Sequence, residues 1–325
     1  MNISEKIFSL RKKLHDHNYR YYVLDDPLIS DYDFDMMLKE LEKLEKENPE
    51  YFDINSPTQR VGGDITKSFN TSAHNTPMYS LDNSYSLEDL KEWEKRIKKI
   101  IDTPVEYTCE LKFDGVSINL TYKDGELLRA VTRGDGVKGD DVTSNIKTIP
   151  TVPLKLRENI AGEFEARGEI VMPLHGFNQL NIKRIENGEE PFKNPRNTAS
   201  GSLKLQDSKE VSERPLECLL YSVEDPKLFN NHIQFLENAK SFGFNIYDNY
   251  KCSSSLDEIF EFIKYWEKNR LNLPFEIDGV VLKVNDFYQR EVLGFTSKFP
   301  RWAMAYKFKP ENTGTRLNNI SFQVG

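Results

Sequence analysis

The sequence predicts an α+β protein, in which a small N-terminal helical domain is followed by a larger domain of antiparallel sheets with flanking helices. Three observations carry this prediction. Apolar residues recur at helical spacing within about the first 50 residues, a series of β-type runs follows a short helix at about 86–101, and helical stretches separate several of those runs. A chain of 325 residues with 38% hydrophobic and 12% aromatic residues can bury a core in each part.

The N-terminal part is expected to form two helices. Their apolar faces are marked by Ile7, Leu10 and Leu14 in the first helix and by Phe34, Met37, Leu38, Leu41 and Leu44 in the second. The stretch DDPLISD breaks the pattern between them, and Ser30 or Asp31 is expected to cap the second helix. The polar stretch NSPTQRVGG at 55–63 predicts a linker, so we expect a helical domain over residues 1–68.

The sheet domain is expected over residues 69–316. Its β-type runs are EYTCELKFD, VSINLTYKDG, ELLRAVTRGDG, FEARGEIVM, LECLLYSVE, EIDGVVLKVN and WAMAYKFKP. Helices are expected between some of these strands, at 177–186 and 256–269. The segments KFDGVSI and EIDGVVL share the pattern xxDGVxx, and we expect them to supply facing strands to one cleft.

Composition narrows the class of protein. No apolar run approaches the length of a membrane span, and the stretch MNISEKIFSLRKKL does not resemble a signal peptide, so a cytoplasmic protein is expected. The formal net charge of −8 argues against binding nucleic acid through the overall field, although a local basic groove is compatible with it. Cys109, Cys218 and Cys252 lack the spacing of a zinc site and are expected to be buried thiols.

The stretch CELKFDGVSI at 109–118 carries the main chemical signal. Alternation along a strand places Glu110, Lys112 and Asp114 on one face, which is either a solvated surface or a reactive site. A lysine attacks as a nucleophile only through its neutral amine, whereas two flanking carboxylates favour the charged form. A reactive lysine here therefore predicts additional cations nearby, from a metal ion or from other lysines.

Lys283 and Lys307 are the candidates for that positive charge. Asp278 and Lys283 are separated by an odd number of residues, so a regular strand would turn them to opposite faces. A bulge at Gly279 would bring both to the same face. The alternative is that each lysine ends a strand in solvent.

Two loops carry arginines in settings suited to phosphate. TRGDGVKGDD at 132–141 places Arg133 at a glycine-rich turn, and NPRNTASGSLK at 194–204 places Arg196 before a possible helical turn. Taken singly, each also fits a plain connection between elements.

The N-terminal part contains a second candidate site. Tyr19, Tyr21 and Tyr22 are expected to pack near a helix start that carries Asp31 and Asp35. Two acids four residues apart on one helical face repel each other, and a pocket for a flat cationic ring would explain them. The alternative is an aromatic core with a solvated acidic edge.

Taken together, CELKFDG, TRGDG, RGEIV, NPRN, EIDGVVLKV and FPRWAMAYKF occur in one order, and the chain closely resembles the adenylation portion of bacterial NAD+-dependent DNA ligases. The resemblance spans essentially the whole chain, including PMYSLDNSYSLEDL at 77–90. The KxDG motif alone is shared with ATP-dependent ligases, RNA ligases and capping enzymes, but the ordered set is specific. It implies a helical domain that binds nicotinamide mononucleotide (NMN) and a nucleotidyltransferase domain of the DNA-ligase type, unrelated to ATP-grasp.

The resemblance also implies roles for individual residues. Lys112 would attack the adenylyl phosphorus of NAD+, release NMN and form lysyl-AMP, from which AMP passes to the 5′-phosphate of a DNA nick. The nucleoside contacts would come from Glu110 to adenine, Asp114 and Arg133 to the ribose region, Glu169 to the ribose hydroxyls, Tyr221 stacking on adenine, and the backbone of Ser80 and Leu81. The cations around the phosphates would be Arg196, Lys283 and Lys307.

The NMN half would be held by Tyr21, Tyr22, Asp31, Asp35 and Arg270. Two positions depart from the family pattern. Phe34 lacks a tyrosine hydroxyl that many members have, and Lys204 replaces an arginine and cannot make a bidentate contact.

The family pattern also implies cofactors and partners. Charge on the α-phosphate calls for Mg2+, with no protein ligand identified, and zinc is expected only in later domains of the family. NNISFQVG resembles the start of an oligonucleotide-binding domain, expected over 317–325 of a truncated chain. We expect a monomer that adenylates itself with NAD+, whereas sealing of nicked double-stranded DNA would need the full-length enzyme.

Two other classes remain as alternatives. The first is an ATP-using ligase or capping nucleotidyltransferase, which the N-terminal pocket disfavours. The second is a binding module for NAD+ or nucleic acid without catalysis, which the intact lysine and its supporting motifs disfavour. A dehydrogenase is excluded because no strand-linked GxGxxG fingerprint is present.

Overall fold

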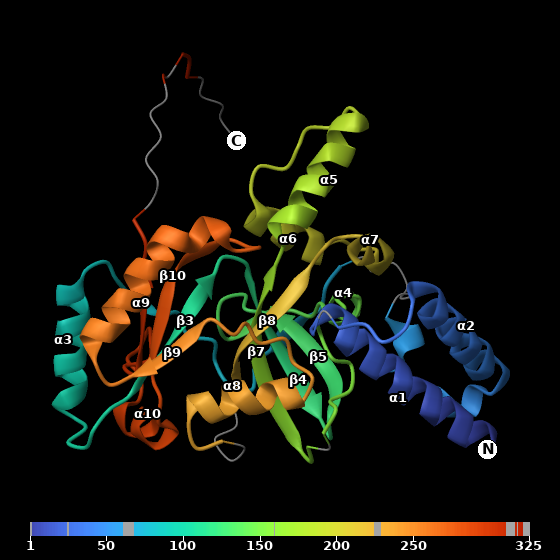
Figure 1. Cartoon of the computed structure of the whole chain (residues 1–325), viewed down its shortest axis with the longest axis horizontal. Helices are drawn as coiled ribbons and strands as arrows, with labels where there is room; N and C mark the ends of the chain where they lie inside the picture. Colours follow the sequence, from blue (N-terminus) through green and yellow to red (C-terminus); the bar gives the residue numbers. More distant parts are fainter. Residues whose placement is uncertain are drawn as a thin grey trace.

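The computed structural model shows a pair of helices at one end of a body built on two β-sheets (Figure 1). It describes residues 2–24, 26–60, 68–158, 160–223, 229–309, 316 and 318–320. The predicted α+β class is confirmed. Within these residues, no helix combines the length and the apolar character needed to cross a membrane.

The helical pair forms where its apolar periodicity predicts it. It consists of α1 (Ile3–Tyr22) and α2 (Asp31–Glu47), followed by the short helices η1 (Pro49–Tyr51) and η2 (Pro57–Gln59). Of the two N-cap candidates for α2, Ser30 is the cap, because its side chain accepts a hydrogen bond from the Asp33 N–H at 3.2 Å. Ile7, Leu14 and Leu41 are fully buried and form the centre of a separate small core.

The prediction of a linker at 55–63 is wrong for residues 55–60, which the structure describes. Asn55, Ser56 and Pro57 are buried, and η2 packs against both α1 and α2. The segment is therefore part of the folded helical unit, because its side chains and backbone turn are used in packing. Residues 61–63 of the proposed linker lie outside the described residues.

The first large sheet is antiparallel throughout, as expected. Its strand order is β5-β4-β7-β8. The strands are β4 (Val116–Lys123), β5 (Glu126–Thr132), β7 (Glu163–Val171) and β8 (Glu217–Val223). The turn KDGE between β4 and β5 is closed by Asp124 and Gly125, both with positive φ, which is why an Asp-Gly pair stands there.

The second large sheet has the order β2-β11-β10-β3-β9. Its strands are β2 (Asp82–Ser84), β3 (Tyr107–Phe113), β9 (Tyr250–Ser253), β10 (Ile277–Val284) and β11 (Ala303–Lys307). One pairing departs from the antiparallel prediction, since β2 runs parallel to β11. A short strand after the N-terminal segment can join the sheet edge in either direction, and its sequence carries no signal for the choice.

The two xxDGVxx segments lie differently from the prediction. KFDG ends β3 and IDGV begins β10, and these strands are antiparallel neighbours in one sheet. They therefore do not face each other across a cleft. The register opposes Lys112 to Gly279 and Glu110 to Val281.

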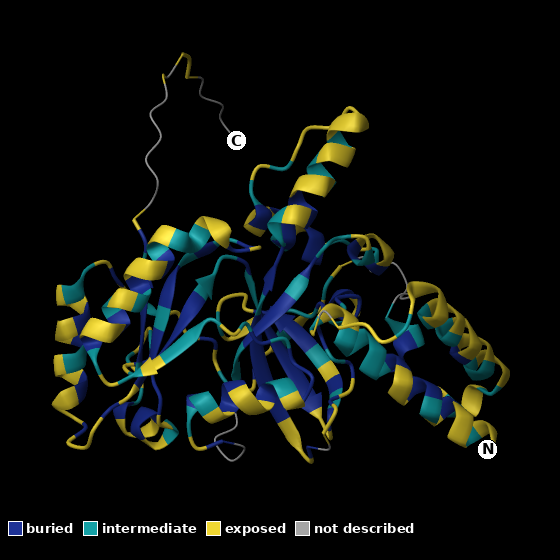
Figure 2. Ribbon diagram, in the orientation of Figure 1, coloured by how far each residue is buried: buried dark blue, intermediate teal, exposed yellow. Residues whose placement is uncertain are grey.

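Helices cover each sheet and seal separate cores. The second sheet buries its apolar face against α3 (Leu87–Lys98), α9 (Leu256–Asn269) and α10 (Phe287–Leu293). The first sheet packs with α4 (Thr143–Lys147), α5 (Leu174–Glu186), α6 (Pro195–Leu203), α7 (Ser208–Ser212) and α8 (His232–Ser241). Figure 2 shows the strands as the buried interior and α5 as a largely exposed projection. The helices expected at 86–101, 177–186 and 256–269 are confirmed, the second beginning three residues earlier.

A small third sheet supports the loop before β2. It joins β1 (Thr71–Ala73) and β6 (Lys138–Asp140) as an antiparallel pair. The described chain also contains η3 (Arg270–Asn272) directly after α9.

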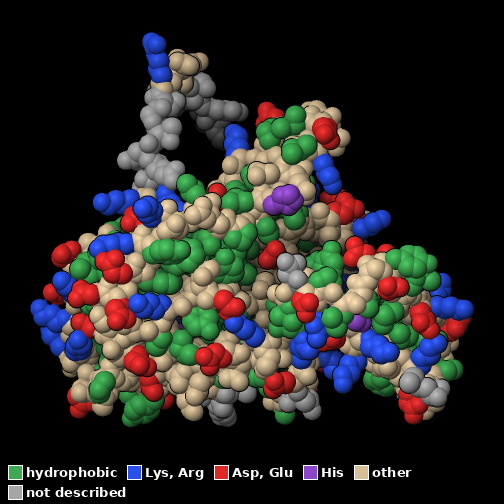
Figure 3. All heavy atoms as spheres, in the orientation of Figure 1, with side chains coloured by type: hydrophobic (Ala, Val, Ile, Leu, Met, Phe, Trp, Pro, Cys, Tyr) green, Lys and Arg blue, Asp and Glu red, His purple; other side chains and the backbone are tan. Residues whose placement is uncertain are grey.

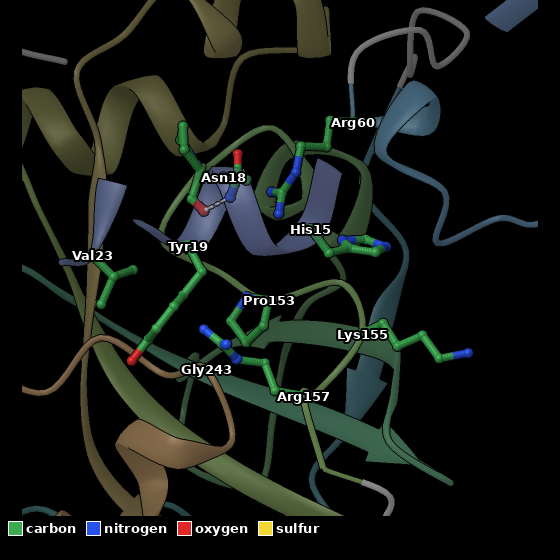
Figure 4. Close-up of a pocket in the computed structure, with 10 residues that line it drawn as sticks. His15, Asn18, Tyr19, Val23, Arg60, Pro153, Lys155, Arg157 and Gly243 are labelled. Atoms are coloured by element: carbon green, nitrogen blue, oxygen red, sulfur yellow. Dashed lines mark hydrogen bonds between the residues drawn. The ribbon is translucent and has the colours of Figure 1, made fainter. Parts of the chain in front are cut away.

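The helical pair is attached to the sheet domain through side chains that meet backbone carbonyls. The Asn18 amide donates to the carbonyl of Pro150 at 2.8 Å, and the Tyr19 hydroxyl donates to the carbonyl of Lys240 at 2.9 Å. Figure 4 shows how these side chains from α1 point into the contact with the sheet domain. Tyr19 therefore bonds to the sheet domain, whereas we expected it to pack near the start of α2.

The cysteines divide into two environments. Cys109 and Cys218 are buried, as expected, and burial raises the pKa of both thiols. Cys252 is exposed, so the expectation of a buried thiol is wrong there. It lies on β9, at the edge of its sheet, where one side chain in two can meet solvent.

Candidate active site

Strand β3 separates its apolar and polar side chains as predicted. Cys109 and Leu111 are buried in the core beneath α3 and α9, with Phe113 packed against that core. Glu110 and Lys112 project to the other face, toward the first sheet. The polar face is therefore a site enclosed between two sheets, and the solvated-surface alternative does not apply.

Lys112 is paired with an acid from the neighbouring strand. Its Nζ lies 2.7 Å and 2.9 Å from the two carboxylate oxygens of Asp278 on β10. We expected Glu110 and Asp114 to be the neighbouring carboxylates, but both of these are engaged with other cations. Sequence reasoning related Asp278 only to Lys283, through a possible bulge, and did not predict its pairing with Lys112.

A β-bulge brings Asp278 to Lys112. The register of β3 and β10 shifts between Ile277 and Gly279, which leaves Asp278 outside the ladder. A side chain at Gly279 would overlap the carbonyl of Tyr306, so a residue without Cβ is required at this crossing of three strands. The bulge proposed from the spacing is thus present, centred on the residue before the glycine.

Lys307 approaches the same carboxylate from the third strand. Its Nζ lies 4.0 Å from Asp278 Oδ2. The two lysines are partly exposed, with 25% of the Lys112 side chain and 36% of the Lys307 side chain accessible. The predicted accumulation of cations around the reactive lysine is therefore present for Lys307.

Glu110 forms a buried network with Lys283 and His232. Glu110 Oε1 lies 2.9 Å from Lys283 Nζ and 2.7 Å from His232 Nε2. Burial opposes ionisation of Glu110, but its two partners outweigh burial and lower its pKa to about 2. Burial lowers the pKa of His232 to about 3, so the ring is neutral at pH 7 and Lys283 is the cation of the network. His232 was missed because a lone histidine in the first turn of a helix carries no sequence signal.

Lys283 also joins the two sheets. Its Nζ donates to the carbonyl of Tyr221 on β8 at 2.8 Å and lies 5.5 Å from the centre of that tyrosine ring. Lys283 and Tyr221 were both predicted as site residues. The structure brings them together with Glu110, on the side of the site that the resemblance assigns to adenine.

Glu169 supplies a carboxyl from the first sheet. It lies on β7 and accepts a hydrogen bond from the Ser117 hydroxyl at 2.8 Å. Burial raises the pKa of Glu169 to about 7, against the opposing effects of Ser117 and of the cations Lys112, Arg196 and Arg133. These electrostatic interactions place Glu169, on the first sheet, beside Lys112, on the second sheet.

Asp114 and Arg196 pair at the edge of the site. Arg196 Nη1 lies 2.7 Å from Asp114 Oδ1, with about half of the arginine side chain exposed. Arg196 stands in the first turn of α6, which Asn194 caps by accepting a hydrogen bond from the Asn197 N–H at 2.9 Å. The helix start thus directs a cation toward the strand end that carries Lys112.

Arg133 and the Ser80–Leu81 segment are held by the same turn. Gly134 and Gly136 adopt positive φ in the turn that follows Arg133, an exposed residue. The Gly136 carbonyl accepts a hydrogen bond from the Met78 N–H at 2.8 Å, which anchors the chain just before Ser80. The two predicted contact segments are therefore structurally connected.

The proposed NMN residues lie together on the helical pair. Tyr21 and Tyr22 are both exposed, with ring centroids 4.8 Å apart. Burial raises the pKa of the Tyr22 hydroxyl, and Asp31 and Asp35 add to this increase, which places both acids near that ring. The group forms an aromatic and acidic surface on α1 and α2.

Arg270 is not part of that surface in this arrangement. It begins η3, and its guanidinium lies 5.9 Å from the centre of the Phe308 ring. Figure 1 shows α9, which leads into η3, on the opposite side of the sheets from α1 and α2. The structure therefore brings together four of the five proposed NMN residues.

Phe34 and Lys204, the two departures from the family pattern, each have a contact in the structure. Phe34 is half-buried and packs against the core of the helical pair. Lys204 forms an ion pair with Asp140 at 2.8 Å. Neither residue contacts Lys112 through an interaction that the structure shows.

The donor groups suit a metal ion that keeps most of its water. Across the described ranges, no three His, Cys, Asp or Glu side chains come together as a metal site. Glu169 nevertheless offers a carboxyl with a raised pKa beside Lys112, and a cation there would favour its ionised form. Mg2+ commonly binds through one or two carboxylates together with phosphate and water, so the residues present fit it.

A lysine held by a carboxylate between two sheets, with further cations and carboxyls around it, is the arrangement expected of a nucleotidyltransferase-type domain. Comparison with known proteins agrees with that class. Residues 66–311 match the family model of the NAD-dependent DNA ligase adenylation domain, and residues 1–62 match the DNA ligase-like, N-terminal NAD+-binding domain. The chain belongs to the NAD-dependent DNA ligase family.

Relatives named DNA ligase match the chain along its whole length. Those of Flavobacterium psychrophilum, Christiangramia forsetii and Flavobacterium johnsoniae are 59%, 56% and 56% identical, each covering 100% of this chain and 49% of the relative. The chain thus spans about half the length of the curated relatives it matches. A solved archaeal ATP-dependent RNA ligase has a TM-score of 0.40 and 13% identity, over 71% of this chain and 48% of that one, which is too low to support an inference.

Proposed function

We propose that this chain is the adenylating part of an NAD+-dependent DNA ligase and that Lys112 is its nucleophile. One observation carries this proposal: the Lys112 amine is held by Asp278 at 2.7 Å and 2.9 Å, at the meeting of two sheets that both present charged groups to it. The match to the adenylation domain family supports the same assignment. The solvated-lysine alternative is disfavoured because only 25% of the Lys112 side chain is exposed.

The proposed step exchanges one bond to phosphorus for another. The neutral amine of Lys112 forms an N–P bond with the adenylyl phosphorus of NAD+, while the bond from that phosphorus to the NMN phosphate oxygen breaks. The amine loses one proton, and Asp278 is the carboxylate placed to accept it. Lys307, 4.0 Å from Asp278, would contact the phosphates where negative charge develops.

The nucleoside would occupy the space between the sheets. Glu110 and Tyr221 would contact the adenine, and Glu169 would contact the ribose hydroxyls. Asp114 and Arg133 would act at the ribose region, with Ser80 and Leu81 contributing backbone groups to adenine. Arg196 would act as a cation near the phosphates. Lys283, which we expected beside it, is bound to Glu110 and to the Tyr221 carbonyl and would therefore act on the adenine side. In support, the structure connects Glu110 to Tyr221 through Lys283.

Mg2+ would bind chiefly through phosphate and water, with Glu169 as the nearby carboxyl. When bound, the ion would reduce the negative charge on the α-phosphate that Lys112 attacks. The protein residues would keep their own roles: Asp278 orients the amine, and Arg196 stays at the edge of the site through Asp114.

The NMN half would be held by Tyr21, Tyr22, Asp31 and Asp35. Two aromatic rings and two carboxylates on one surface suit a flat cationic nicotinamide ring. Arg270 would join this site only after α9 and the helical pair approach each other. We include it as the fifth contact of the proposed NMN site.

The full-length protein is proposed to pass AMP from Lys112 to the 5′-phosphate of nicked double-stranded DNA. We further propose that it works as a monomer in the cytoplasm. Basic and acidic side chains are interspersed on the face drawn in Figure 3, which fits the expectation that this chain alone seals nicks poorly. Residues 1–68, 69–316 and 317–325 remain the proposed domain divisions.

The direct test is transfer of a labelled adenylate to the protein. The chain is incubated with Mg2+ and with either NAD+ or ATP labelled in the adenylate, and covalent label is measured. Label is expected from NAD+ only, and Lys112→Ala should abolish it. Lys123→Ala, at an exposed position at the end of β4, is the matched control and should label normally. Label from ATP but not from NAD+, or equal labelling of Lys112→Ala, would overturn the proposal.

The NMN site is tested separately on the helical pair. Asp35→Ala should reduce labelling by NAD+ by about ten-fold or more, because a charged contact to the nicotinamide ring is lost. Glu42→Ala changes another exposed acid of α2 and should have no effect. Equal behaviour of the two variants would remove the NMN site from this surface while leaving the role of Lys112 intact.

A further inference from the structure

We propose that His232 is a positioning residue that holds Glu110 as an acceptor for the adenine amino group and thereby makes the site selective for adenine. The proposal rests on the function proposed above and concerns a residue that none of its steps uses. The observations that carry it are the fixed place of the ring, the direction of its hydrogen bond, and the way the two oxygens of Glu110 are used.

The ring of His232 is fixed from several sides. Only 1% of the side chain is exposed, and its centroid lies 5.2 Å from that of Phe235 and 6.4 Å from that of Phe287. Its backbone N–H donates to the carbonyl of Asn285 at 2.9 Å, which ties the start of α8 to the end of β10. The ring is therefore held against the strand that carries Lys283.

The direction of the hydrogen bond follows from the chemistry of the partners. Carboxylate oxygens only accept, and an ammonium only donates. At 2.7 Å, His232 Nε2 and Glu110 Oε1 must share a proton, so the tautomer carries its hydrogen on Nε2. His232 Nε2 and Lys283 Nζ lie 3.2 Å apart because both donate to the same carboxylate, and neither donates to the other.

The other nitrogen of the ring supports this assignment. His232 Nδ1 is buried and has no hydrogen-bond partner among the described residues. A protonated ring would place a second buried N–H there without an acceptor, which is costly. Burial likewise lowers the pKa of His232 to about 3. The ring is thus a neutral donor, and within the described residues the acceptor of its N–H is Glu110.

The consequence lies in Glu110. His232 and Lys283 both bind Oε1, so Oε2 is the oxygen left to meet a ligand. An anionic oxygen accepts from the 6-amino group of adenine. It repels the 6-carbonyl oxygen of hypoxanthine, whose shape is otherwise similar. If the histidine donor is lost, the carboxylate can turn about its bond, and this preference should weaken.

The experiment compares two dinucleotides in the same protein. Single-turnover formation of the covalent adduct is measured against concentration for NAD+ and for nicotinamide hypoxanthine dinucleotide. His232→Leu should raise the half-saturating concentration of NAD+ and reduce the preference for NAD+, each by about ten-fold, the loss typical of a hydrogen bond to a charged group. The maximal rate should change by a few-fold at most, because Lys112 and Asp278 are untouched.

Two polar variants form the matched control. His232→Gln places its amide near the former Nε2 and should restore affinity and base preference to within about three-fold of the original protein. His232→Asn is shorter, cannot reach Glu110, and should behave like His232→Leu. Circular dichroism is recorded for each variant, and the Gln and Asn pair decides the question if the leucine variant fails to fold.

The outcomes separate this proposal from the proposed function. Absence of adduct in the original protein would contradict the proposed function itself. With adduct present, a folded Asn variant equal to the original protein, or a Gln variant with the losses of Leu, would overturn the role of His232. An equal loss for both dinucleotides would also overturn it, since a purely structural residue has no reason to distinguish bases.

Discussion

The buried carboxyl of Glu169 makes the stability of the protein depend on pH. It lies beside Lys112, and it accepts a hydrogen bond from the Ser117 hydroxyl. Burial raises its pKa from 4.5 to about 7, so between these pH values the unfolded chain has lost a proton that the folded protein keeps. The contribution of Glu169 to stability therefore falls as pH rises from 4.5 to 7, and then stays constant.

Glu169→Gln should remove this dependence on pH. Relative to the original protein, the variant should gain about 1–3 kcal/mol of unfolding free energy at pH 8 and little at pH 4.5. Urea unfolding at the two pH values measures the difference. Glu163→Gln, exposed at the start of the same strand, should show no such change. A gain that is the same at both pH values would contradict the assigned role of ionisation.

The bulge of β10 is the local feature on which the site depends. Where β3, β10 and β11 cross, Gly279 is opposed by Lys112 on one side and by Lys307 on the other. A residue without a side chain lets the three strands approach, and the irregular register turns Asp278 toward both lysines. The bulge at Asp278 and Gly279 therefore both lets the strands pack and places the carboxylate between the two lysines.

Gly279→Ala should disturb both stability and reactivity. The added Cβ would overlap the Tyr306 carbonyl, and the strands must separate to admit it. We expect a loss of about 1–3 kcal/mol of unfolding free energy, measured by denaturant, together with slower adduct formation. Gly201→Ala is the control, since among the described residues an added Cβ on α6 would meet no atom within 4 Å outside the helix's own backbone. It should leave the protein as stable or about 0.5–1 kcal/mol more stable.

The arrangement of the whole molecule depends on how the helical pair attaches to the sheets. Arg60 donates to the carbonyls of Lys147, Ile149 and Val152 at 3.1 Å, 3.1 Å and 3.0 Å. Burial lowers the pKa of Arg60 to about 10, which leaves it charged at pH 7. One guanidinium therefore satisfies three carbonyls of the sheet domain from the segment that follows α2.

Arg60→Ala should loosen this attachment. Three carbonyls would lose their donor, and we expect a loss of about 2–4 kcal/mol of unfolding free energy, with faster amide exchange in α1 and α2. Arg20→Ala is the control. Arg20 makes its ion pairs to Asp16 and Asp26 within the helical pair, at a partly exposed position, and its loss should cost less than about 1 kcal/mol. Equal effects of the two changes would contradict the special role of Arg60.

Much of the local structure was predictable because neighbouring residues specify it. Helical spacing located α1, α2 and α9, and alternation in CELKF separated the buried Leu111 from the polar Lys112. The odd separation between Asp278 and Lys283 indicated that a bulge at Gly279 would be needed to bring both to one face, and the register shifts at that point. The family assignment likewise needed only the order of short motifs.

The partners of these residues could not be read from the same patterns. Lys112 and Asp278 are 166 residues apart, and His232 and Glu110 are 122 apart. Tyr19 turned to the sheet domain, and Arg270 lies away from the other proposed NMN residues, because packing between elements places them. Periodicity and turn chemistry act over a few residues and define elements and faces. Which lysine meets which carboxylate depends on strand register and on how the sheets pack, and these arise only when distant segments compete to bury the same surfaces.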